Sequence, residues 1–210
     1  MTGLFVAFEG GEGAGKTVQL GLLAEWLQAA GHRVRLTREP GATPAGERIR
    51  GIVLDPGSTL TPRAEALLYA ADRAEHVETV IVPALAAGEV VLSDRYVDST
   101  LAYQGAGRAL DSAQVRQLND WATGGLCPDL TVLLDLDPTI GLARAGGRRR
   151  LDRIEQESLA FHHRVRAEFL RLAATQPARY LVLDAGGELD ALAVAVRHRL
   201  AGLLATVVTT

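Results

Sequence analysis

The stretch that decides the fold is Gly10-Gly11-Glu12-Gly13-Ala14-Gly15-Lys16-Thr17, which fills every fixed position of the pattern G-x-x-x-x-G-K-[ST]. Glycines at these positions let backbone N–H groups turn toward phosphate oxygens, where larger side chains would crowd them. Lys16 can reach the β- and γ-phosphates of a nucleotide, and the Thr17 hydroxyl can ligate Mg²⁺. The stretch therefore predicts a phosphate-binding loop.

The segments on either side of the loop favour this interpretation over a chance match. Residues 4–8 are uniformly apolar and predict a buried strand. From Thr17 to Ala30 apolar residues recur at helical spacing, and Gly31 ends the helix. The loop thus opens a helix whose N-terminal dipole would face the bound phosphates.

Strands and helices alternate along the rest of the chain. Further strands are predicted at 33–37, 90–92, 130–136 and 180–183. Helices are predicted at 43–54, from 61 to a kink or break at Pro83, at 111–123 and at 189–204. Another helix is predicted after Pro138; residues 146–150 interrupt it, and helical spacing then resumes through 174. Apolar strands in this alternation predict an α/β fold with a five-stranded parallel sheet and helices on both faces, the three-layer fold of P-loop NTPases. The 210 residues suit a single domain over 1–210.

Composition narrows the class of protein. The net charge is −3, which gives no overall basic field for nucleic acid or an anionic membrane surface. One cysteine, Cys127, excludes an internal disulfide framework and suits a reducing compartment. No apolar run reaches the roughly 18 residues that a membrane span needs, and residues 1–8 lead directly into a strand, so we expect no signal peptide. These features predict a cytoplasmic protein without nucleic-acid or membrane partners.

Polar residues follow the second and third predicted strands. Arg38 and Glu39 come after the second strand, and Asp94 and Arg95 after the third. Ligands of parallel α/β sheets bind at the carboxyl ends of strands, so Asp94 is placed to hold Mg²⁺ together with Thr17. The alternatives are a turn or helix cap for Asp94 and a surface ion pair for Arg95.

Arginines are the second signal. Arg38, Arg50, Arg73 and Arg95 lie near predicted strand ends or on segments that could fold over them. Phosphoryl transfer needs fixed positive charge, and the planar arginine fork binds phosphate through two hydrogen bonds. Any single arginine is more often solvated, but several at one sheet edge favour phosphate chemistry.

A glycine-rich basic segment lies between two helical stretches at about 143–155. Gly146 and Gly147 are followed by Arg148, Arg149 and Arg150. We interpret the segment as a short basic lid that closes on a polyphosphate and excludes water. The alternative is a basic solvent-exposed loop.

Tyr69 and Arg73 are one helical turn apart, so both can face one pocket. A ring and a guanidinium could hold a flat base there, by stacking and by hydrogen bonding. A tyrosine on an apolar helix face is otherwise more often part of the core.

These residues together resemble one family, the bacterial thymidylate kinases, over nearly the whole chain. The segments that carry the resemblance are Phe8-Glu9-Gly10, Thr37-Arg38-Glu39-Pro40-Gly41, Tyr69-Ala70-Ala71-Asp72-Arg73, Asp94-Arg95-Tyr96, Ser99–Gly107 and Leu151-Asp152-Arg153-Ile154-Glu155. The resemblance implies a P-loop kinase domain that transfers the γ-phosphoryl group of ATP to dTMP, with Mg²⁺ as cofactor and a homodimer formed by helices around 62–80 and 111–123.

The resemblance also implies roles for individual residues. Catalytic roles fall to Lys16, Arg95, Glu12, Arg148 and Arg153, and the ATP phosphates bind the loop at 10–17. Mg²⁺ is held by Thr17 and Asp94. The dTMP site is implied at Glu12, Arg38, Glu39, Arg50, Tyr69, Arg73, Arg95, Tyr103 and Gln104. In this set Tyr69 stacks on thymine, Arg73 and Gln104 hydrogen-bond its edge, and Tyr103 packs under the deoxyribose.

The lid arginine and three departures bear on this assignment. The family carries a catalytic arginine either in the loop, at the slot that Gly13 fills here, or in a basic lid. Gly13 with the 148–150 cluster resembles the second arrangement, with Arg148 expected to reach the transferred phosphoryl group and Arg153 or Arg149 as alternatives. Tyr69 replaces the usual phenylalanine, Thr100 a serine and Ala42 a glycine, and none removes a charge.

Two other functions remain open from the residues. The first is a kinase for another monophosphate or a deoxynucleoside on the same scaffold. The second is a nucleotide-sensing module without catalysis, although a sensor would not need the second, acceptor-side set of residues.

Overall fold

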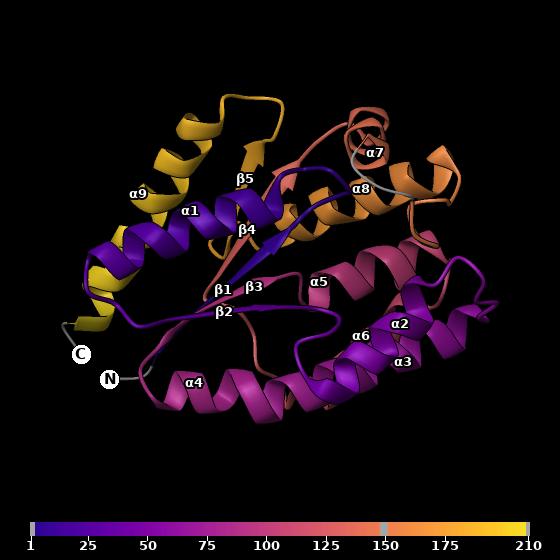
Figure 1. Ribbon diagram of the computed structural model, residues 1–210, viewed down its shortest axis with the longest axis horizontal. Coiled ribbons are helices and arrows are strands. Elements are labelled where there is room, and N and C mark those ends of the chain that lie inside the picture. The colour runs from indigo at the N-terminus through magenta and orange to yellow at the C-terminus, as the bar shows by residue number, and fades with distance from the viewer. Residues whose placement is uncertain (1–2, 148–150, 209–210) are drawn as a thin grey trace.

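The computed structural model describes residues 3–147 and 151–208 of the chain. Within these residues, five strands form one parallel sheet in the order β2-β3-β1-β4-β5 (Figure 1). The strands are β1 (Leu4–Glu9), β2 (Val34–Arg38), β3 (Val90–Asp94), β4 (Leu130–Asp135) and β5 (Tyr180–Asp184). The order brings β1, β2 and β3 together at one side of the sheet, so the polar groups that follow these strands lie at one edge.

The helices match the expected alternation except at 97–107, where the sequence predicted no helix and the structure has one. They are α1 (Lys16–Ala29), α2 (Pro44–Leu54), α3 (Pro62–His76), α4 (Val82–Ala86), α5 (Val97–Thr100), α6 (Ser112–Thr123), α7 (Pro138–Gly146), α8 (Leu159–Thr175) and α9 (Leu189–Val208). Two π-helical segments, η1 (Val77–Ile81) and η2 (Leu101–Gly107), continue α3 and α5. Side-chain caps begin several helices, and the predicted cap Asp111 accepts a hydrogen bond from the Gln114 backbone N–H at 2.9 Å.

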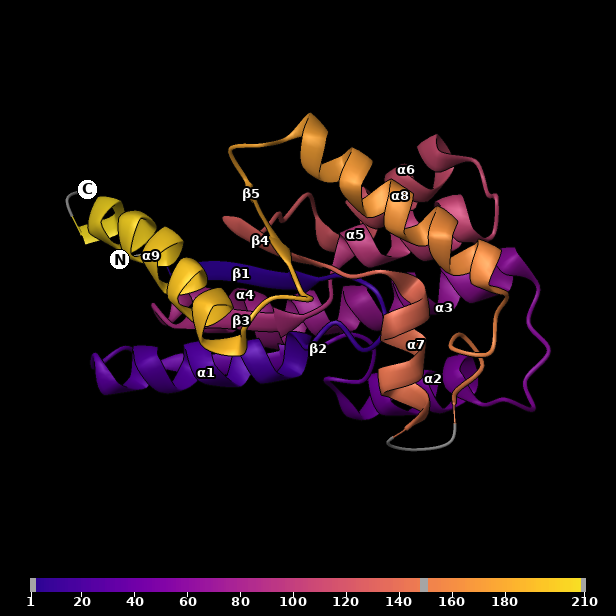
Figure 2. The ribbon, with the colours of Figure 1, turned by 90° about the horizontal axis from the view of Figure 1, so that it is seen from above.

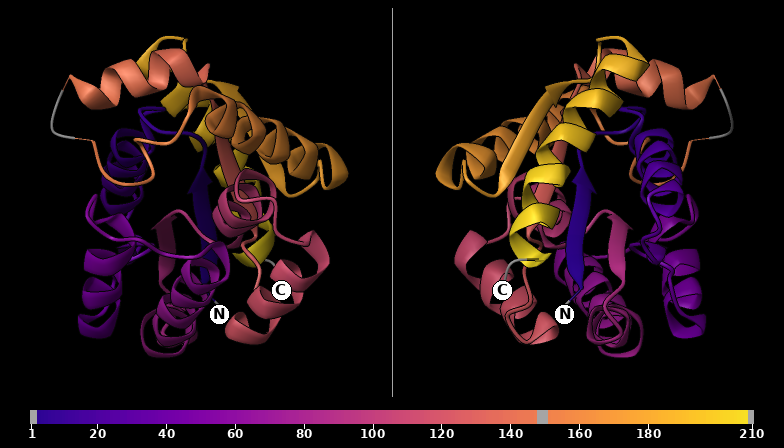
Figure 3. Two further views of the ribbon diagram at one scale, coloured as in Figure 1. Left: turned by 90° about the vertical axis from the view of Figure 1, so that its right-hand side faces the viewer. Right: turned by 90° about the vertical axis from the view of Figure 1, so that its left-hand side faces the viewer.

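Helices cover both faces of the sheet, as the apolar strands predicted (Figure 3). In β1, Leu4, Val6 and Phe8 pack toward α1 and α9, whereas Phe5 and Ala7 pack toward η1 and α4. This alternation buries the strand on both faces. A third apolar cluster joins α8 to η2 beside β4. The α/β fold with a five-stranded parallel sheet is confirmed.

The sequence predicted a kink or break at Pro83, and the structure shows no break there. The long helix runs from Pro62 to Ala86, and the π-helical turn η1 lies directly before Pro83. A proline lacks the N–H of a regular helix and clashes with the preceding turn. The wider π-helical turn accommodates both effects, so the helical run continues through Pro83 to Ala86.

Helix α7 leads away from the sheet edge (Figure 2). Arg148, Arg149 and Arg150, the core of the predicted lid, lie outside the described residues. Among the helices that are described, none is long and apolar enough to cross a membrane.

Candidate active site

Three strand ends meet at the functional edge of the sheet. Phe8 of β1 and Arg38 of β2 both pair with Asp94 of β3. This register places the 10–17 loop, the Arg38–Gly41 segment and the Asp94–Tyr96 segment beside one another. Their proximity in space was expected from the sequence, and the strand order supplies it.

The phosphate loop adopts backbone conformations that glycine allows. Gly10, Gly13 and Gly15 have φ angles of 136°, 64° and 91°. Lys16 begins α1 and is 8% exposed, and its Nζ donates to the carbonyl oxygens of Gly10 at 3.1 Å and Gly11 at 2.8 Å. The lysine thus lies folded over the loop, where its charge is available to a phosphate.

A hydroxyl and a carboxylate meet at the start of α1. Thr17 Oγ1 donates to Asp94 Oδ2 at 2.8 Å, from an exposed position. Both are hard oxygen ligands of the kind that Mg²⁺ prefers. Within the described part of the chain, no cluster of three or more His, Cys, Asp or Glu side chains could hold a metal.

Arg95 lies at the centre of the edge. Its Nη1 donates to Gly10 O and Ser99 Oγ, both at 3.0 Å, and its Nη2 donates to Glu12 Oε1 at 3.0 Å. The guanidinium also lies 5.0 Å from the centroid of the Tyr103 ring. These contacts fix a permanent positive charge beside the phosphate loop.

Glu12 is the carboxylate partner of Arg95. Its Oε1 also accepts a hydrogen bond from Tyr103 OH at 2.7 Å. Burial alone would raise the pKa of Glu12, but the charges of Arg95 and Lys16 outweigh it and lower the pKa to about 2. Glu12 is therefore an anion at neutral pH, and its contacts with Arg95 and Tyr103 fix the position of its carboxylate.

Two cavities open at this edge and share a wall. The first is lined by Glu12, Glu39, Pro40, Arg50, Leu54, Tyr69, Arg73, Arg95, Ser99, Thr100, Tyr103, Gln104, Asp152 and Ile154. The second contains the residues of the phosphate loop from Glu12 to Thr17, together with Arg38, Asp94 and others. Glu12, Glu39, Arg50 and Arg95 line both. The two cavities therefore adjoin at Arg95 and Glu12.

The residues assigned from the sequence to dTMP gather in the first cavity, with one exception. Arg38 lines the second cavity and pairs with exposed Glu47. Arg50 lines both, and its Nη1 donates to Pro40 O at 2.8 Å. Tyr69 lines the first cavity, where burial raises the pKa of its hydroxyl.

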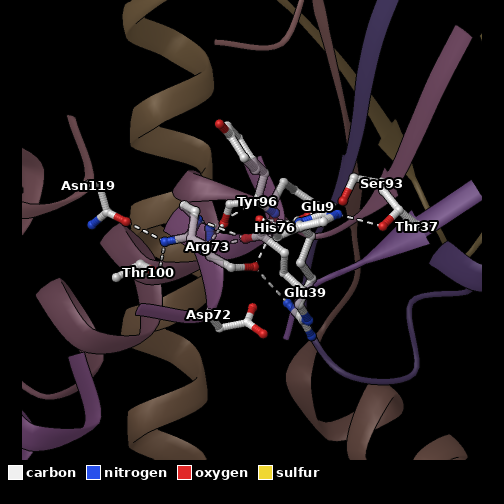
Figure 4. A network of polar contacts seen from close by, with 12 residues as sticks. Glu9, Thr37, Glu39, Asp72, Arg73, His76, Ser93, Tyr96, Thr100 and Asn119 are labelled. Atoms are coloured by element: carbon white, nitrogen blue, oxygen red, sulfur yellow. Dashed lines mark hydrogen bonds and ion pairs between the residues drawn. The ribbon is translucent and has the colours of Figure 1, made fainter. Parts of the chain in front are cut away.

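Arg73 is buried in a polar network that involves each of its guanidinium nitrogens (Figure 4). Nε donates to Glu39 Oε2 at 2.8 Å and Nη2 donates to Tyr96 O at 3.0 Å. Nη1 donates to Thr100 Oγ1 at 2.8 Å and to Asn119. Arg73 lines the first cavity, but a hydrogen bond to a base there would have to replace or share one of these contacts.

The same network holds the segment after β2. His76 Nδ1 lies 2.8 Å from Glu39 Oε1, and its Nε2 lies 2.6 Å from Thr37 Oγ1. Asp72 Oδ1 accepts from the Gly41 backbone N–H at 2.9 Å. Burial and the nearby Glu39 charge raise the pKa of Asp72 to about 6. Sequence reasoning gave His76 no role; its spacing of one helical turn from Asp72 was the available signal.

Comparison with known proteins agrees with this arrangement. Residues 8–195 match the family described as thymidylate kinase. A thymidylate kinase of Clavibacter sepedonicus is 56% identical over 206 residues, covering 98% of each chain. One from Deinococcus radiodurans is 58% identical over 183 residues, covering 87% of this chain and 89% of the relative.

The chain belongs to the thymidylate kinase family. A crystal structure of the thymidylate kinase from Ehrlichia chaffeensis is similar, with a TM-score of 0.79 and 33% identity, and the match covers 96% of this chain and 100% of the other. The family resemblance inferred from the sequence is confirmed.

Arg153 contacts α2 and α3. Its Nε donates to Val53 O at 2.8 Å, and its Nη2 donates to Glu65 Oε2 at 2.6 Å. Arg153 N–H also donates to Leu54 O at 3.1 Å. In this conformation Arg153 joins the segment before α8 to α2 and α3. Its assignment as a catalytic lid arginine stays a prediction, as does that of Arg148, which lies outside the described residues.

Sequence reasoning assigned no role to two buried glutamates, Glu65 and Glu9. Glu65 on α3 binds Gln104, Arg108 and Arg153. Its spacing of four residues from Tyr69 could have placed it on the pocket face of the helix.

Glu9 was quoted only as a marker of the family. Its Oε1 accepts from the backbone N–H groups of Tyr96 at 2.9 Å and Ser99 at 3.2 Å, and its Oε2 accepts from Ser99 Oγ at 2.6 Å. Ser99 Oγ in turn accepts from Arg95 Nη1. The signal was a charged residue at the end of an otherwise apolar strand.

Proposed function

We propose that this chain transfers the γ-phosphoryl group of ATP to the 5′-phosphate of dTMP, giving dTDP and ADP, with the donor at the phosphate loop and the acceptor in the first cavity. The main observation behind this assignment is that the two cavities share a wall, which includes Arg95 and Glu12. Membership of the thymidylate kinase family supports the reaction and both substrates.

The reaction requires aligned substrates and fixed positive charge near the phosphates rather than a strong base. A phosphate monoester has a second pKa of about 6, so the attacking oxygen of dTMP is already ionised near neutral pH. Lys16 would hold the donor phosphates, and Arg95 would bridge donor and acceptor phosphates. Glu12 would orient Arg95 and approach the acceptor sugar. Fixed charges that need no rearrangement during the reaction stabilise its transition state.

Mg²⁺ fits the donor side. Thr17 and Asp94 offer adjacent hard oxygens, and the metal would supply charge neutralisation of the phosphates when bound.

On the acceptor side, Tyr69 would stack on thymine and Tyr103 would pack under the deoxyribose. Gln104 and Arg73 would face the base edge, while Arg38, Glu39 and Arg50 would line the phosphate end. Arg148 would close on the transferred phosphoryl group, as part of a lid at about 143–155 in a single kinase domain over 1–210.

An acceptor panel tests the function. Purified protein with ATP and Mg²⁺ is given dTMP, dUMP, dCMP, dGMP or thymidine, and ADP release is measured. We expect dTMP to give the highest kcat/KM. Equal rates on thymidine would contradict the proposal in favour of a nucleoside kinase, and ATP binding without acceptor-dependent ADP release would favour a sensing module.

We also propose that two copies associate through α3 and α6. Trp121 on α6 is 82% exposed and Leu67 on α3 is 52% exposed. Trp121 also lines a hollow together with Val77 and Val82. Apolar surface of this kind is typical of an interface between subunits.

The single cysteine Cys127 supports a cytoplasmic location.

A further inference from the structure

Glu65 is a buried carboxylate next to the proposed base-binding residue Gln104. Its Oε1 accepts from Gln104 Nε2 at 2.7 Å and from Arg108 Nε at 3.1 Å. Its Oε2 accepts from Arg153 Nη2 at 2.6 Å and lies 3.0 Å from Arg108 Nη2. The side chain is 1% exposed. Gln104 lies in η2, Arg108 directly follows η2, and Arg153 precedes α8, so side chains from two separate parts of the chain converge on one carboxylate.

This carboxylate is ionised at neutral pH. Burial would raise the pKa of Glu65, but hydrogen bonds from Arg108, Gln104 and Arg153 outweigh it and lower the pKa. An ionised carboxylate only accepts hydrogen bonds. Gln104 must therefore turn its NH₂ group toward Glu65, and its carbonyl oxygen cannot occupy that position.

An amide held in one orientation can distinguish between pyrimidine bases by their hydrogen-bonding groups. Gln104 lines the first cavity, and it keeps one N–H and its carbonyl Oε1 for another partner. Thymine presents O4, an acceptor, next to N3–H, a donor. Cytosine presents the reverse, an amino donor next to a bare N3. A side-chain amide that can flip complements both bases, whereas an amide held in one orientation complements only one of them.

We propose that Glu65 is a specificity-determining positioning residue: by fixing the Gln104 amide, it makes the pocket accept a base with an N3–H beside O4 and reject cytosine. The inference rests on the proposed function, because it takes Gln104 as the residue that contacts the base. Glu65 itself does not touch the substrate. Through Arg153 it also joins this selection to the end of the lid segment.

The test is Glu65→Gln, assayed with dTMP, dUMP and dCMP. The substituted side-chain amide can either donate or accept, so it no longer imposes one orientation on Gln104. We expect the ratio of kcat/KM for dCMP to that for dTMP to rise at least about tenfold. The ratio for dUMP to dTMP stays within about twofold, because uracil and thymine share the same hydrogen-bonding edge. All three substrates are measured on one preparation, so a partly unfolded fraction cancels from the ratios.

Glu157→Gln is the matched control. Glu157 pairs with Arg108 at 2.5 Å at the far side of the same cluster. The control removes one ion pair of the cluster and leaves the bond between Glu65 and Gln104 in place, so both ratios should keep the wild-type values. If Glu65→Gln does not fold, the double variant Glu65→Gln/Arg108→Gln, which keeps the charge balance of the cluster, takes its place with the same expected ratios.

An unchanged dCMP ratio would overturn the inference, and so would a parallel rise of the dUMP ratio, since that indicates a general loosening of the pocket. A rise of the same size in Glu157→Gln would overturn it as well. Failure of the proposed function is distinguishable, because then the wild-type protein would not phosphorylate dTMP.

Discussion

At the scale of single residues, Arg95 combines a functional position with an uncommon backbone conformation. Its φ angle is 74°, in the left-handed region that costs a residue with a Cβ about 1 kcal/mol or more. Its N–H donates to Phe8 O at 2.9 Å, and its carbonyl accepts from Ser93 Oγ at 2.7 Å. The surrounding strands therefore hold Arg95 where its guanidinium meets Glu12.

Lys16→Met tests the donor side of the site. The substitution removes the charge that lies over the phosphate loop, and it leaves the lining of the first cavity intact because Lys16 is not part of that lining. We expect kcat to fall by at least about a hundredfold, because a preorganised charge for the transition state is lost. The affinity for dTMP, measured by calorimetry without ATP, should stay within about threefold. Loss of dTMP binding would contradict the donor-side assignment of Lys16.

Glu9 predicts a pH dependence of stability. Burial first, and then the charge of Asp98, raise the pKa of Glu9 from 4.5 to about 7. The folded state keeps this proton where the unfolded chain has lost it, so the contribution of Glu9 to stability is full below about pH 4.5 and is lost as the pH rises through about 7. For Glu9→Gln we expect the free energy of unfolding to fall less steeply between about pH 5 and pH 7, by about 1 kcal/mol per pH unit.

Urea denaturation at several pH values measures this slope. Glu75→Gln, at an exposed glutamate of α3, is the control and should retain the wild-type slope. Identical slopes for Glu9→Gln and the wild type would show that Glu9 does not titrate in this range.

At the scale of elements, the phosphate loop packs against α7. A Cβ on Gly13 would lie 2.2 Å from Gly141 O on α7, and a Cβ on Gly141 would lie 2.2 Å from Glu12 O. The two backbones touch at these glycines. From the sequence, Gly13 mattered because it fills a slot where the family can carry an arginine. The structure adds that a side chain at Gly13 would displace α7.

Gly141→Ala tests this contact without requiring a positive φ angle. The added methyl group cannot fit against the backbone of Glu12, so α7 and the loop must move apart. We expect a loss of stability of about 1–3 kcal/mol and a rise in the KM for ATP of several-fold or more. Thermal unfolding and steady-state kinetics measure the two effects.

Gly21→Ala in α1 is the matched control, because a Cβ there has nothing within 4 Å. It should stabilise the protein by about 0.5–1 kcal/mol through helix propensity. Equal effects of the two substitutions would contradict a role for the contact between the loop and α7.

The π-helical segments show where helix prediction from sequence reaches its limit. Tyr103 and Gln104 lie in η2, which continues α5 and packs against α8. Propensity and apolar spacing do not distinguish a π-helix from an α-helix, because the two differ in one backbone hydrogen-bond register. The types of residue that line the pocket were therefore predictable, but the π-helical conformation of the segment that carries Tyr103 and Gln104 was not.

At the scale of the whole molecule, the proposed dimer surface predicts an effect on assembly. A charge at Trp121 would have to be buried between subunits, which is unfavourable without a partner. We expect Trp121→Glu to shift the protein from dimer to monomer in sedimentation experiments at micromolar concentration. Val194→Glu is the control, since Val194 is 62% exposed on α9, away from α3 and α6, and should leave the assembly state unchanged. A monomeric wild-type protein would contradict the proposed association.

The sequence by itself determined the phosphate loop, the alternation of strands and helices, and the residues at the strand ends. These features depend on local chemistry: glycines that permit an unusual backbone, apolar runs that must be buried, and the edge at which parallel strands end. It also determined the family, through segments in a fixed order.

The tertiary structure decided which of these side chains are free to act. It engaged every guanidinium nitrogen of Arg73, directed Arg153 to Val53 and Glu65, and placed Glu65 against Gln104. The partners lie 23 to 100 residues apart along the chain. Hydrogen bonds over such separations depend on how helices pack across the sheet, and local sequence patterns do not specify that packing.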